Sequence, residues 1–465
     1  MINSLQGKYH ELRTNYPKFI YSGYSISEAD EVLCLDYHFT IPDLTEFKPH
    51  WEIKKPKECA IDLNDTRLNK LAFSLGMVEL VSYWKATCSP KVHIACGNLS
   101  QEQSEWWRKL YKKGLGEFFY TNGIEADDDF MSIVCNEQSE HIEKSTHSHS
   151  SASVEVLPSY EKTLIPVGGG KDSVVTIELL KNYTDRFCYI INPRKATLDT
   201  VVATSIPADR VVIANRTIDK NVIDLNKKGF LNGHTPFSAI VAFSSVIAAY
   251  IHKIGFVALS NESTASEPTV LGSDVNHQYS KSLEFETDFI EFEAKYILSG
   301  VKYFSFLRPL TEIGIAKIFS QLKNYHPIFR SCNVGSKNDI WCANCPKCLF
   351  VYTILSPFLP PLEMEKIFGK NMLDDVALMT DFEKLAGLQA EKPFECVGSR
   401  DEVNAALQEL VRIYERDDKP LPKLLEAYKK FDTLNKQDIA EMCSSFDEKN
   451  YVPEQFVKLL EARLK

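Results

Sequence analysis

Short apolar runs alternate with longer amphipathic segments between residues 163 and 359. The strand-like runs cover 163–167, 187–191, 210–213, 256–260 and 301–306, and the helix-like segments cover 173–181, 236–253, 286–298 and 312–322. Thr235 and Pro236 form a good helix start, because a capping hydroxyl precedes a proline at the first helical position. Alternation of this kind predicts an α/β domain with a parallel sheet and helices on both of its faces.

The flanking regions have different patterns. Residues 30–41 alternate apolar and polar positions as a half-buried strand does, whereas 77–82 and 106–124 have helical spacing, with Gly114 closing a helix. We therefore expect an N-terminal α+β domain over residues 1–137. Beyond residue 360 the chain is charged and helical in pattern, which predicts a helical C-terminal region over 361–465 and places the α/β domain at 160–360.

Residues 138–159 are rich in serine and contain His141, His147 and His149. This composition is typical of a solvated linker. Metal capture by the three histidines is the alternative, but no regular spacing favours it over a polar loop.

Composition narrows the class of protein. The 465 residues carry a formal net charge of −10, which argues against a large nucleic-acid-binding surface. The longest apolar run, 237–251, is too short to span a bilayer and is expected to be a buried helix. The first residues lack the apolar core of a signal peptide, and the 12 cysteines do not resemble a secreted disulfide framework. Both features predict a cytoplasmic protein.

Three consecutive glycines follow the first predicted strand of the α/β domain. They belong to the segment LIPVGGGKDSVVTIELL, in which Gly168, Gly169 and Gly170 are followed by Lys171, Asp172 and Ser173 and then by a helical pattern. Backbone amides at such a helix start favour an anion, and the absence of side chains allows a phosphate to come close. Lys171 adds positive charge and Ser173 adds a hydroxyl. A tight corner that binds no ligand is the simpler alternative.

Two common phosphate-binding motifs do not fit these residues. The Walker loop requires Ser or Thr after its lysine, where this chain has Asp172, and the dinucleotide fingerprint requires a glycine at position 173. The segment instead resembles the PP-loop of ATP pyrophosphatases, Ser-Gly-Gly-x-Asp-Ser, with Gly168 in place of the leading serine. The resemblance implies a HUP-like fold, similar to that of adenine nucleotide α hydrolases. It also implies ATP cleavage to an adenylate and diphosphate, with Mg²⁺ held through Asp172.

Four cysteines form a C-x9-C-x2-C-x2-C array in the segment RSCNVGSKNDIWCANCPKC. They are Cys332, Cys342, Cys345 and Cys348. Four thiolates with this spacing suit a structural Zn²⁺ site, with unliganded cysteines or an iron–sulfur cluster as alternatives. The other cysteines, Cys396 among them, show no such spacing and are expected to be core or incidental residues. The array and the preceding RPLTEIGIAKI resemble the PP-loop enzyme QueC, but NGHTPFSA (232–239) departs from the QueC pattern, which puts the substrate pocket in doubt.

A similarity to the MurL family extends over most of the chain. It is carried by GLGEFFYTNGI, PVGGGKDSVV, SNEST, VNHQYSKSLEFE and CANCPKCLFVY. MurL enzymes are UDP-N-acetylmuramoyl-L-alanyl-L-glutamate epimerases of peptidoglycan synthesis, so the resemblance implies a UDP-muramoyl dipeptide substrate. Adenylation of the glutamate carboxylate would remove its negative charge and make the adjacent Cα–H more acidic. Proton removal and return on the opposite face would then invert the centre.

The residues that move the proton are less clearly indicated by the sequence. The stretch SDVNHQYSKSLEFE follows the predicted strand 256–260, where the carboxyl ends of parallel strands form a crevice. His277 is the first candidate for an acid or base, since an imidazole exchanges protons near neutral pH. Lys281 is a candidate to neutralise a phosphate or carboxylate. A hydrogen-bonded loop histidine and a solvated lysine are the ordinary alternatives.

Two other functions fit parts of the pattern. The first is a synthetase that adenylates another carboxylate or a nucleobase, for which the net charge of −10 gives little support. The second is a non-catalytic protein that binds ATP through a degenerate loop with Gly168 in place of serine. Release of diphosphate from ATP distinguishes the enzymes from the binding protein.

Overall fold

The computed structural model describes residues 2–57, 60–136, 158–431 and 437–464. The chain divides into two compact units that are each assembled from separate stretches. Unit 1 contains Met1–Lys162, Ala214–Phe256 and Glu291–Lys302, and unit 2 contains Thr163–Ile213, Val257–Ile290 and Tyr303–Lys465. The boundaries expected from the sequence are consecutive and stay a prediction. Nearly all of the expected linker 138–159 lies outside the described residues, and its last residue, Ser159, begins a strand.

Unit 1 contains a mixed sheet. Its strands are β1 (Lys18–Ala29), β2 (Val32–Ile41), β3 (Thr45–Phe47), β4 (His50–Lys54), β5 (Lys91–Ile94) and β6 (Ser132–Cys135), with the end of β9 (Val211–Thr217). They lie in the order β9-β4-β2-β1-β5-β6, and β3 pairs with β2. The β1–β2 hairpin is antiparallel, whereas β5 runs parallel to β1 and to β6. The alternating pattern of residues 30–41 thus predicted β2 correctly.

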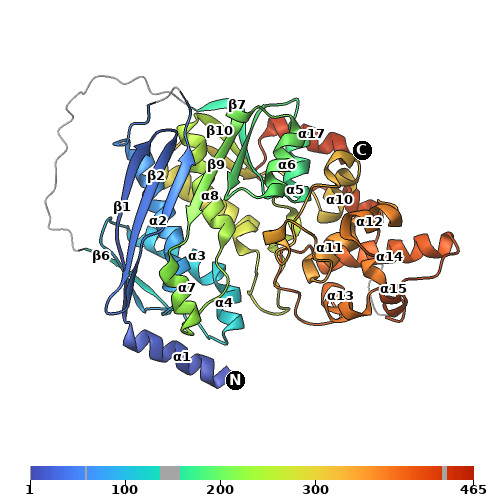
Figure 1. The fold of residues 1–465 in the computed structure, drawn as a ribbon, viewed down its shortest axis with the longest axis horizontal. Helices are drawn as coiled ribbons and strands as arrows, with labels where there is room; N and C mark the ends of the chain where they lie inside the picture. The colour runs from blue at the N-terminus through green and yellow to red at the C-terminus, as the bar shows by residue number, and fades with distance from the viewer. Residues whose placement is uncertain (1, 58–59, 137–157, 432–436, 465) are drawn as a thin grey trace. The chain divides into compact units, whose positions relative to one another are not determined.

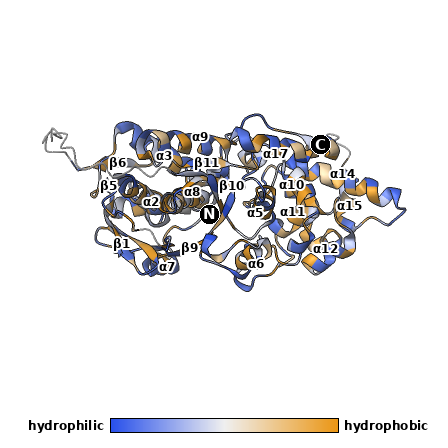
Figure 2. Ribbon diagram, turned by 90° about the horizontal axis from the view of Figure 1, so that it is seen from above, coloured by the Kyte–Doolittle hydropathy of each residue, from blue (hydrophilic) through white to orange (hydrophobic). Residues whose placement is uncertain are grey.

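The helices of unit 1 are α1 (Ile2–Asn15), α2 (Thr66–Trp84), α3 (Gln101–Gly114), α4 (Gly116–Thr121), α7 (Lys220–Lys227) and α8 (Phe237–Ile251). Hydrophobic residues lie along α2 and α8, which pack against each other and are buried over most of their length (Figure 2). The expected helices around residues 77–82 and 106–124 and the buried helix 237–251 are therefore confirmed. Among the described residues, no helix combines the length and the apolar character that crossing a membrane requires.

The start of α8 differs from the sequence prediction. Pro236 is the residue before the helix rather than its first residue, and no side chain caps it. Thr235 does not cap α8, and its hydroxyl instead accepts a hydrogen bond from Lys85 Nζ at 2.8 Å.

The sheet of unit 2 has the order β11-β10-β7-β8-β9. Its strands are β7 (Ser159–Pro166), β8 (Asp185–Ile191), β10 (Ile254–Leu259) and β11 (Lys302–Ser305), with the start of β9. Helix α5 (Lys171–Leu179) connects β7 to β8, and helix α6 (Lys195–Thr204) lies between β8 and β9. The protein is α/β with a mostly parallel sheet, as expected. From β7 the chain adds β8 and β9 on one side, and it then adds β10 and β11 on the other side of β7. This change in the order of strands between β7 and β10 is a topological switch point, and open α/β sheets bind ligands there, beyond the carboxyl ends of the strands.

Three other elements differ in detail from the sequence pattern. The expected helix 286–298 is α9 (Leu283–Phe292) followed by a π-helical turn, Glu293–Ile297, which ends at Leu298 with φ of +63°. The expected strand 210–213 begins one residue later and continues to Thr217, because a 3-10 turn occupies Ala208–Arg210. The helix expected at 312–322 is α10 (Glu312–Ser320), capped by the Thr311 hydroxyl.

The rest of unit 2 is helical, as the charged pattern beyond residue 360 predicted. It contains α11 (Pro346–Leu355), α12 (Pro361–Phe368), α13 (Met379–Leu385), α14 (Arg400–Arg416), α15 (Lys423–Tyr428), α16 (Ile439–Ser444) and α17 (Glu454–Leu464). The orange helices α11 to α15 cluster together in Figure 1, and α10 packs against α5, α11, α14 and α16. These contacts place the start of α10 beside the start of α5.

Candidate active site

The three glycines lie between β7 and α5, at the topological switch point of the sheet of unit 2. Gly170 is the residue before α5, and no side chain caps this helix end. Helix α5 begins at Lys171, two residues earlier than the sequence pattern predicted. The amides of its first turn have no partners within the helix, and with the helix dipole they form a site suited to an anion.

Gly169 is required by the shape of the turn. Its φ is +84°, and a Cβ atom there would lie 3.2 Å from Ala196 Cβ and 3.3 Å from the Thr197 amide nitrogen. Its carbonyl accepts a hydrogen bond from the Arg330 amide at 2.7 Å. At Gly168, by contrast, an added Cβ would meet no atom within 4 Å. The fold therefore fixes the middle glycine and leaves space at the first.

Lys171 is buried between two carboxylates at the start of the helix. Its ammonium group forms ion pairs with Asp172 and, at 2.9 Å, with Glu312 of α10. Burial disfavours the charged form of Lys171, but the two carboxylates outweigh this effect and raise its pKa. The same lysine, helped by Lys347 and Lys281, holds the pKa of Asp172 below its usual value despite burial.

Glu312 has the opposite shift. Burial raises its pKa to about 8, against the attraction of Lys171 and with repulsion from Asp172 and Glu262. One of its carboxylate oxygens, Oε2, is buried and accepts no hydrogen bond from the described residues. A buried oxygen without a partner costs free energy, which makes this atom suited to a bound cation or to protonation.

Ser173 lies in the first turn of α5, next to the glycine turn. Its hydroxyl donates to the Gly170 carbonyl oxygen at 3.1 Å, so the side chain is held beside the turn.

The end of β10 forms the other side of the topological switch point. Thr176 of α5 is hydrogen-bonded to Ser260, the residue after β10, at 2.8 Å between their hydroxyls. Glu262 is buried, and its carbonyl oxygen accepts a hydrogen bond from Arg308. Arg308 also donates to Glu286 at 3.0 Å and to the Lys281 carbonyl oxygen at 2.5 Å. Arg308 therefore fixes the backbone of Glu262 and Lys281, and the carboxylate of Glu286 is its ion-pair partner.

The segment that carries His277 and Lys281 meets Cys396. Lys281 donates a hydrogen bond to the sulfur of Cys396, whereas the His277 Nε2 atom lies 3.9 Å from that sulfur. Burial disfavours the charged form of Lys281, but Cys396, Glu262 and Asp172 raise its pKa. Lys281 thus approaches Cys396 directly and is attracted by the charge of Asp172, and His277 approaches the same sulfur.

The four cysteines of the array converge as the spacing predicted. The sulfur atoms of Cys332 and Cys345 lie 3.9 Å apart, those of Cys342 and Cys348 3.7 Å, and those of Cys345 and Cys348 3.4 Å. Four sulfurs around a zinc ion at about 2.3 Å would be separated by about 3.8 Å, so the donor set fits this metal. Hydrogen bonds with the other thiols, Cys348 first, lower the pKa of Cys345 to about 5, which favours a thiolate ligand.

The cysteine loop also touches the glycine turn. A Cβ on Gly170 would lie 3.3 Å from Ser331 Cβ, next to Cys332, and the Arg330 amide binds the Gly169 carbonyl. An ion on the four cysteines would therefore support the shape of the turn.

Family models match most of the chain. The model described as MurL N-terminal domain matches residues 10–306, and the one described as MurL C-terminal domain matches residues 328–440. The chain belongs to the MurL family. No solved structure matches it.

Three curated relatives carry the name UDP-N-acetyl-alpha-D-muramoyl-L-alanyl-L-glutamate epimerase. The protein from Micromonospora is 32% identical over 88% of this chain and 90% of its own length. The protein from Salinispora tropica is 31% identical over 84% of each chain, and that from Xanthomonas oryzae is 31% identical over 74% of this chain and 75% of its own length. The MurL resemblance seen in the sequence segments is thus confirmed at the level of the family.

Sequence reasoning missed two residues of the polar cluster in this MurL family member. Glu312 had no motif to mark it beyond its place in RPLTEIGIAKI, and Cys396 was expected to be a core or incidental residue. Both are brought to the cluster only by tertiary contacts, because Glu312 lies 141 positions along the chain from Lys171 and Cys396 lies 115 positions from Lys281. A polar residue at the predicted start of a helix, such as Glu312, was the one available signal.

Proposed function

We propose that this protein epimerises the terminal L-glutamate of UDP-N-acetylmuramoyl-L-alanyl-L-glutamate to D-glutamate, with ATP converted to AMP and diphosphate. Membership of the MurL family and the names of three relatives support the substrate and the epimerisation. The uncapped start of α5 after three glycines is the observation that carries the use of ATP, because it suits a departing diphosphate. A PP-loop type of chemistry on a HUP-like fold is part of this proposal.

The first step would join the substrate carboxylate to the α-phosphorus of ATP. Gly168, Gly169, Gly170 and the amide of Lys171 would hold the diphosphate by their backbone, and the Ser173 hydroxyl lies beside them. Asp172 and the unpartnered oxygen of Glu312 are carboxylates suited to Mg²⁺, which would neutralise phosphate charge. Catalysis of this step would come from positioning and charge stabilisation.

The second step would exchange the α-proton of the activated glutamate. Once the carboxylate is an acyl adenylate its negative charge no longer opposes loss of the Cα proton. His277 is proposed to take part in this proton transfer, since an imidazole exchanges protons near neutral pH, and Lys281 is the proposed partner of a phosphate or carboxylate. Hydrolysis of the mixed anhydride would then release the D-glutamyl product and AMP.

The four cysteines are proposed to hold a structural Zn²⁺, since four thiolates fill a tetrahedral site and leave no open position for catalysis. We also propose that the protein acts in the cytoplasm on this small-molecule substrate, without a membrane or nucleic-acid partner, in the synthesis of peptidoglycan precursors.

The test is to incubate the purified protein with UDP-N-acetylmuramoyl-L-alanyl-L-glutamate, ATP and Mg²⁺, followed by chiral analysis of the glutamate and measurement of diphosphate. We expect D-glutamate to accumulate together with diphosphate, and neither to form when ATP is left out. Diphosphate release with glutamate remaining L would point to a synthetase for another reaction. ATP binding without diphosphate from any candidate acid would point to a non-catalytic protein, and either result would overturn the proposal.

A further inference from the structure

Cys396 lies between two basic side chains in unit 2. Lys281 donates a hydrogen bond to its sulfur, and His277 Nε2 lies 3.9 Å from the same atom. Lys347 donates to the Cys396 carbonyl oxygen, which brings a third basic side chain to this residue. Cys396, His277 and Lys281 are all half-buried.

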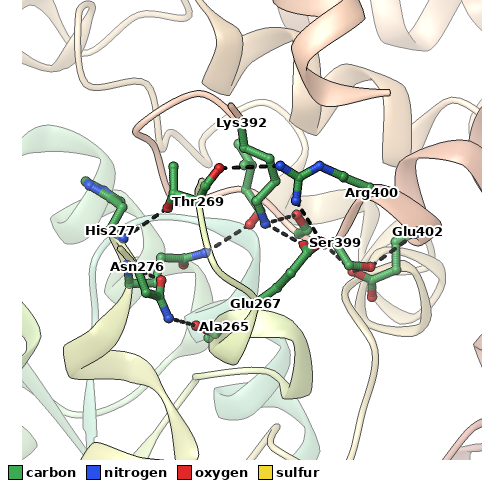
Figure 3. A network of polar contacts seen from close by, with 12 residues as sticks. Ala265, Glu267, Thr269, Asn276, His277, Lys392, Ser399, Arg400 and Glu402 are labelled. Carbon is green, nitrogen blue, oxygen red and sulfur yellow. Dashed lines mark hydrogen bonds and ion pairs between the residues drawn. The ribbon is translucent and has the colours of Figure 1, made fainter. Parts of the chain in front are cut away.

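A network of polar contacts holds the two segments of this cluster together. Figure 3 shows the His277 amide donating to the Thr269 hydroxyl at 3.0 Å, while the Thr269 carbonyl accepts from the Lys392 amide at 2.9 Å. Glu267 pairs with Lys392 at 2.5 Å and with Arg400 at 3.0 Å. The segment with His277 is thereby fixed against the segment between Lys392 and Arg400, which carries Cys396.

The basic neighbours stabilise the ionised form of the thiol. Burial by itself would raise the pKa of Cys396, but Lys281, a hydrogen bond from His277 and the charge of Lys347 lower it to about 6. Cys396 is therefore mainly a thiolate at neutral pH. Ordinary cysteines, with a pKa of about 8.5, are mainly thiols under the same conditions.

The same lysines connect Cys396 to the glycine turn. The positive charges of Lys281 and Lys347 lower the pKa of Asp172 as well as that of Cys396. The charge of Lys347 also favours the ionised form of Glu312. The Glu312 side chain is 3% exposed, and its Oε2 atom is buried without a hydrogen bond from the described residues. Cys396 and this unsatisfied carboxylate thus share Lys347 as a positively charged neighbour, which favours a ligand that reaches from the turn to Cys396.

We propose that Cys396 is the catalytic base that removes the α-proton of the activated glutamate, and that His277 and Lys281 hold it as a thiolate. This inference rests on the proposed function and assigns its proton-transfer step. The sulfur takes the proton from Cα, and the electron pair of the C–H bond moves into the acyl carbonyl to give an enolate. A water molecule on the opposite face returns a proton to Cα. The hydroxide so formed is neutralised by the proton of the Cys396 thiol, passed on through His277.

The test compares Cys396→Ser and Cys396→Ala with the wild-type protein in D₂O, with diphosphate release and deuterium at the glutamate Cα measured in the same reaction. We expect both variants to release diphosphate in the first turnover within about tenfold of wild type, and deuterium incorporation to fall about 10²–10⁴-fold. Cys135→Ser, a half-buried cysteine of unit 1, is the matched control and should incorporate deuterium normally. Deuterium incorporation by Cys396→Ala at the wild-type rate would overturn the inference. A wild-type protein that never releases diphosphate would overturn the proposed function instead.

A second measurement needs no turnover. The rate at which iodoacetamide alkylates Cys396, followed by mass spectrometry, should rise with a midpoint near pH 6 in the wild-type protein. In Lys281→Met and His277→Asn the midpoint should move toward about 8.5. A wild-type midpoint already near 8.5 would contradict the thiolate, even if Cys396→Ala had failed to fold.

Discussion

At the scale of residues, the start of α5 depends on a balance of buried charges. Lys171 is 3% exposed and forms ion pairs with Asp172 and Glu312, the latter also 3% exposed. The sequence motif pointed to Lys171 and Asp172 because they directly follow the glycines. The motif did not show that Asp172 pairs with Lys171, and the second partner of the lysine, Glu312, comes from a different helix. A lysine that was expected to add positive charge to the turn is therefore paired with carboxyl groups at the start of the helix.

The Asp172→Asn variant should lose diphosphate release. The substitution removes the carboxylate proposed to hold Mg²⁺ and one of the two partners of buried Lys171. We expect the rate of diphosphate release to fall at least about 10²–10³-fold, the usual cost of losing one charge-stabilising group. The matched control is Asp185→Asn, since Asp185 is exposed and pairs with Arg210 at 3.0 Å, away from the glycine turn. Normal turnover by Asp172→Asn would remove this carboxylate from the mechanism.

At the scale of elements, the turn between β7 and α5 and the cysteine loop are each recognisable from sequence spacing. The glycines were predicted to allow close approach of a phosphate. The structure adds that only the middle one has a left-handed φ, that the second and third have close neighbours, and that the first has open space. Gly168, where the PP-loop pattern has serine, is therefore the glycine that the fold does not require.

Gly169→Ala and Gly168→Ala should behave differently. An alanine at position 169 would adopt φ near +84° with its Cβ against Ala196, so we expect a loss of about 1–3 kcal/mol in the free energy of unfolding. The change at Gly168 should stay within about 0.5 kcal/mol. Urea denaturation of both variants, with binding of ATP measured alongside, checks this. Equal destabilisation of the two would contradict the geometry of the turn.

The cysteine loop yields a prediction about metal removal. Cys345→Ser should release zinc and weaken ATP binding, because the loop contacts the glycine turn through Arg330 and Ser331. Metal analysis of the purified protein and nucleotide titration measure the two effects, with Cys135→Ser as the control that keeps both. Intact protein that contains no zinc would exclude the structural metal site.

At the scale of the whole molecule, each compact unit is made of stretches far apart in the chain. In unit 1, strand β4 pairs with the end of β9, and α2 packs against α8. Glu79 of α2 is fully buried and accepts hydrogen bonds from Arg216 at 2.5 and 2.7 Å and from Trp51 at 2.8 Å. The first 137 residues thus leave out a strand, a helix and the cation that pairs with a buried carboxylate.

A fragment of residues 1–137 should therefore fail to fold by itself. Without Arg216 the Glu79 carboxylate would be buried and uncompensated, a situation that typically costs about 3–5 kcal/mol, and the apolar face of α2 would lie open. Urea unfolding followed by near-ultraviolet circular dichroism should show no cooperative transition for the fragment and a clear one for the full chain. A cooperative transition in the fragment would support an independent N-terminal domain with the boundary expected from the sequence.

The sequence by itself determined the α/β class, the succession of most strands and helices, the glycine turn, the cysteine array and the resemblance to MurL. These features depend on residues close together in the chain, whose periodicity and spacing can be read directly. Only the tertiary structure decided that Glu312 meets Lys171, that Cys396 lies between Lys281 and His277, and that unit 1 needs residues beyond 213. The physical reason is that burial and charge pairing act between residues brought together by packing, and no local pattern specifies which distant partner will arrive.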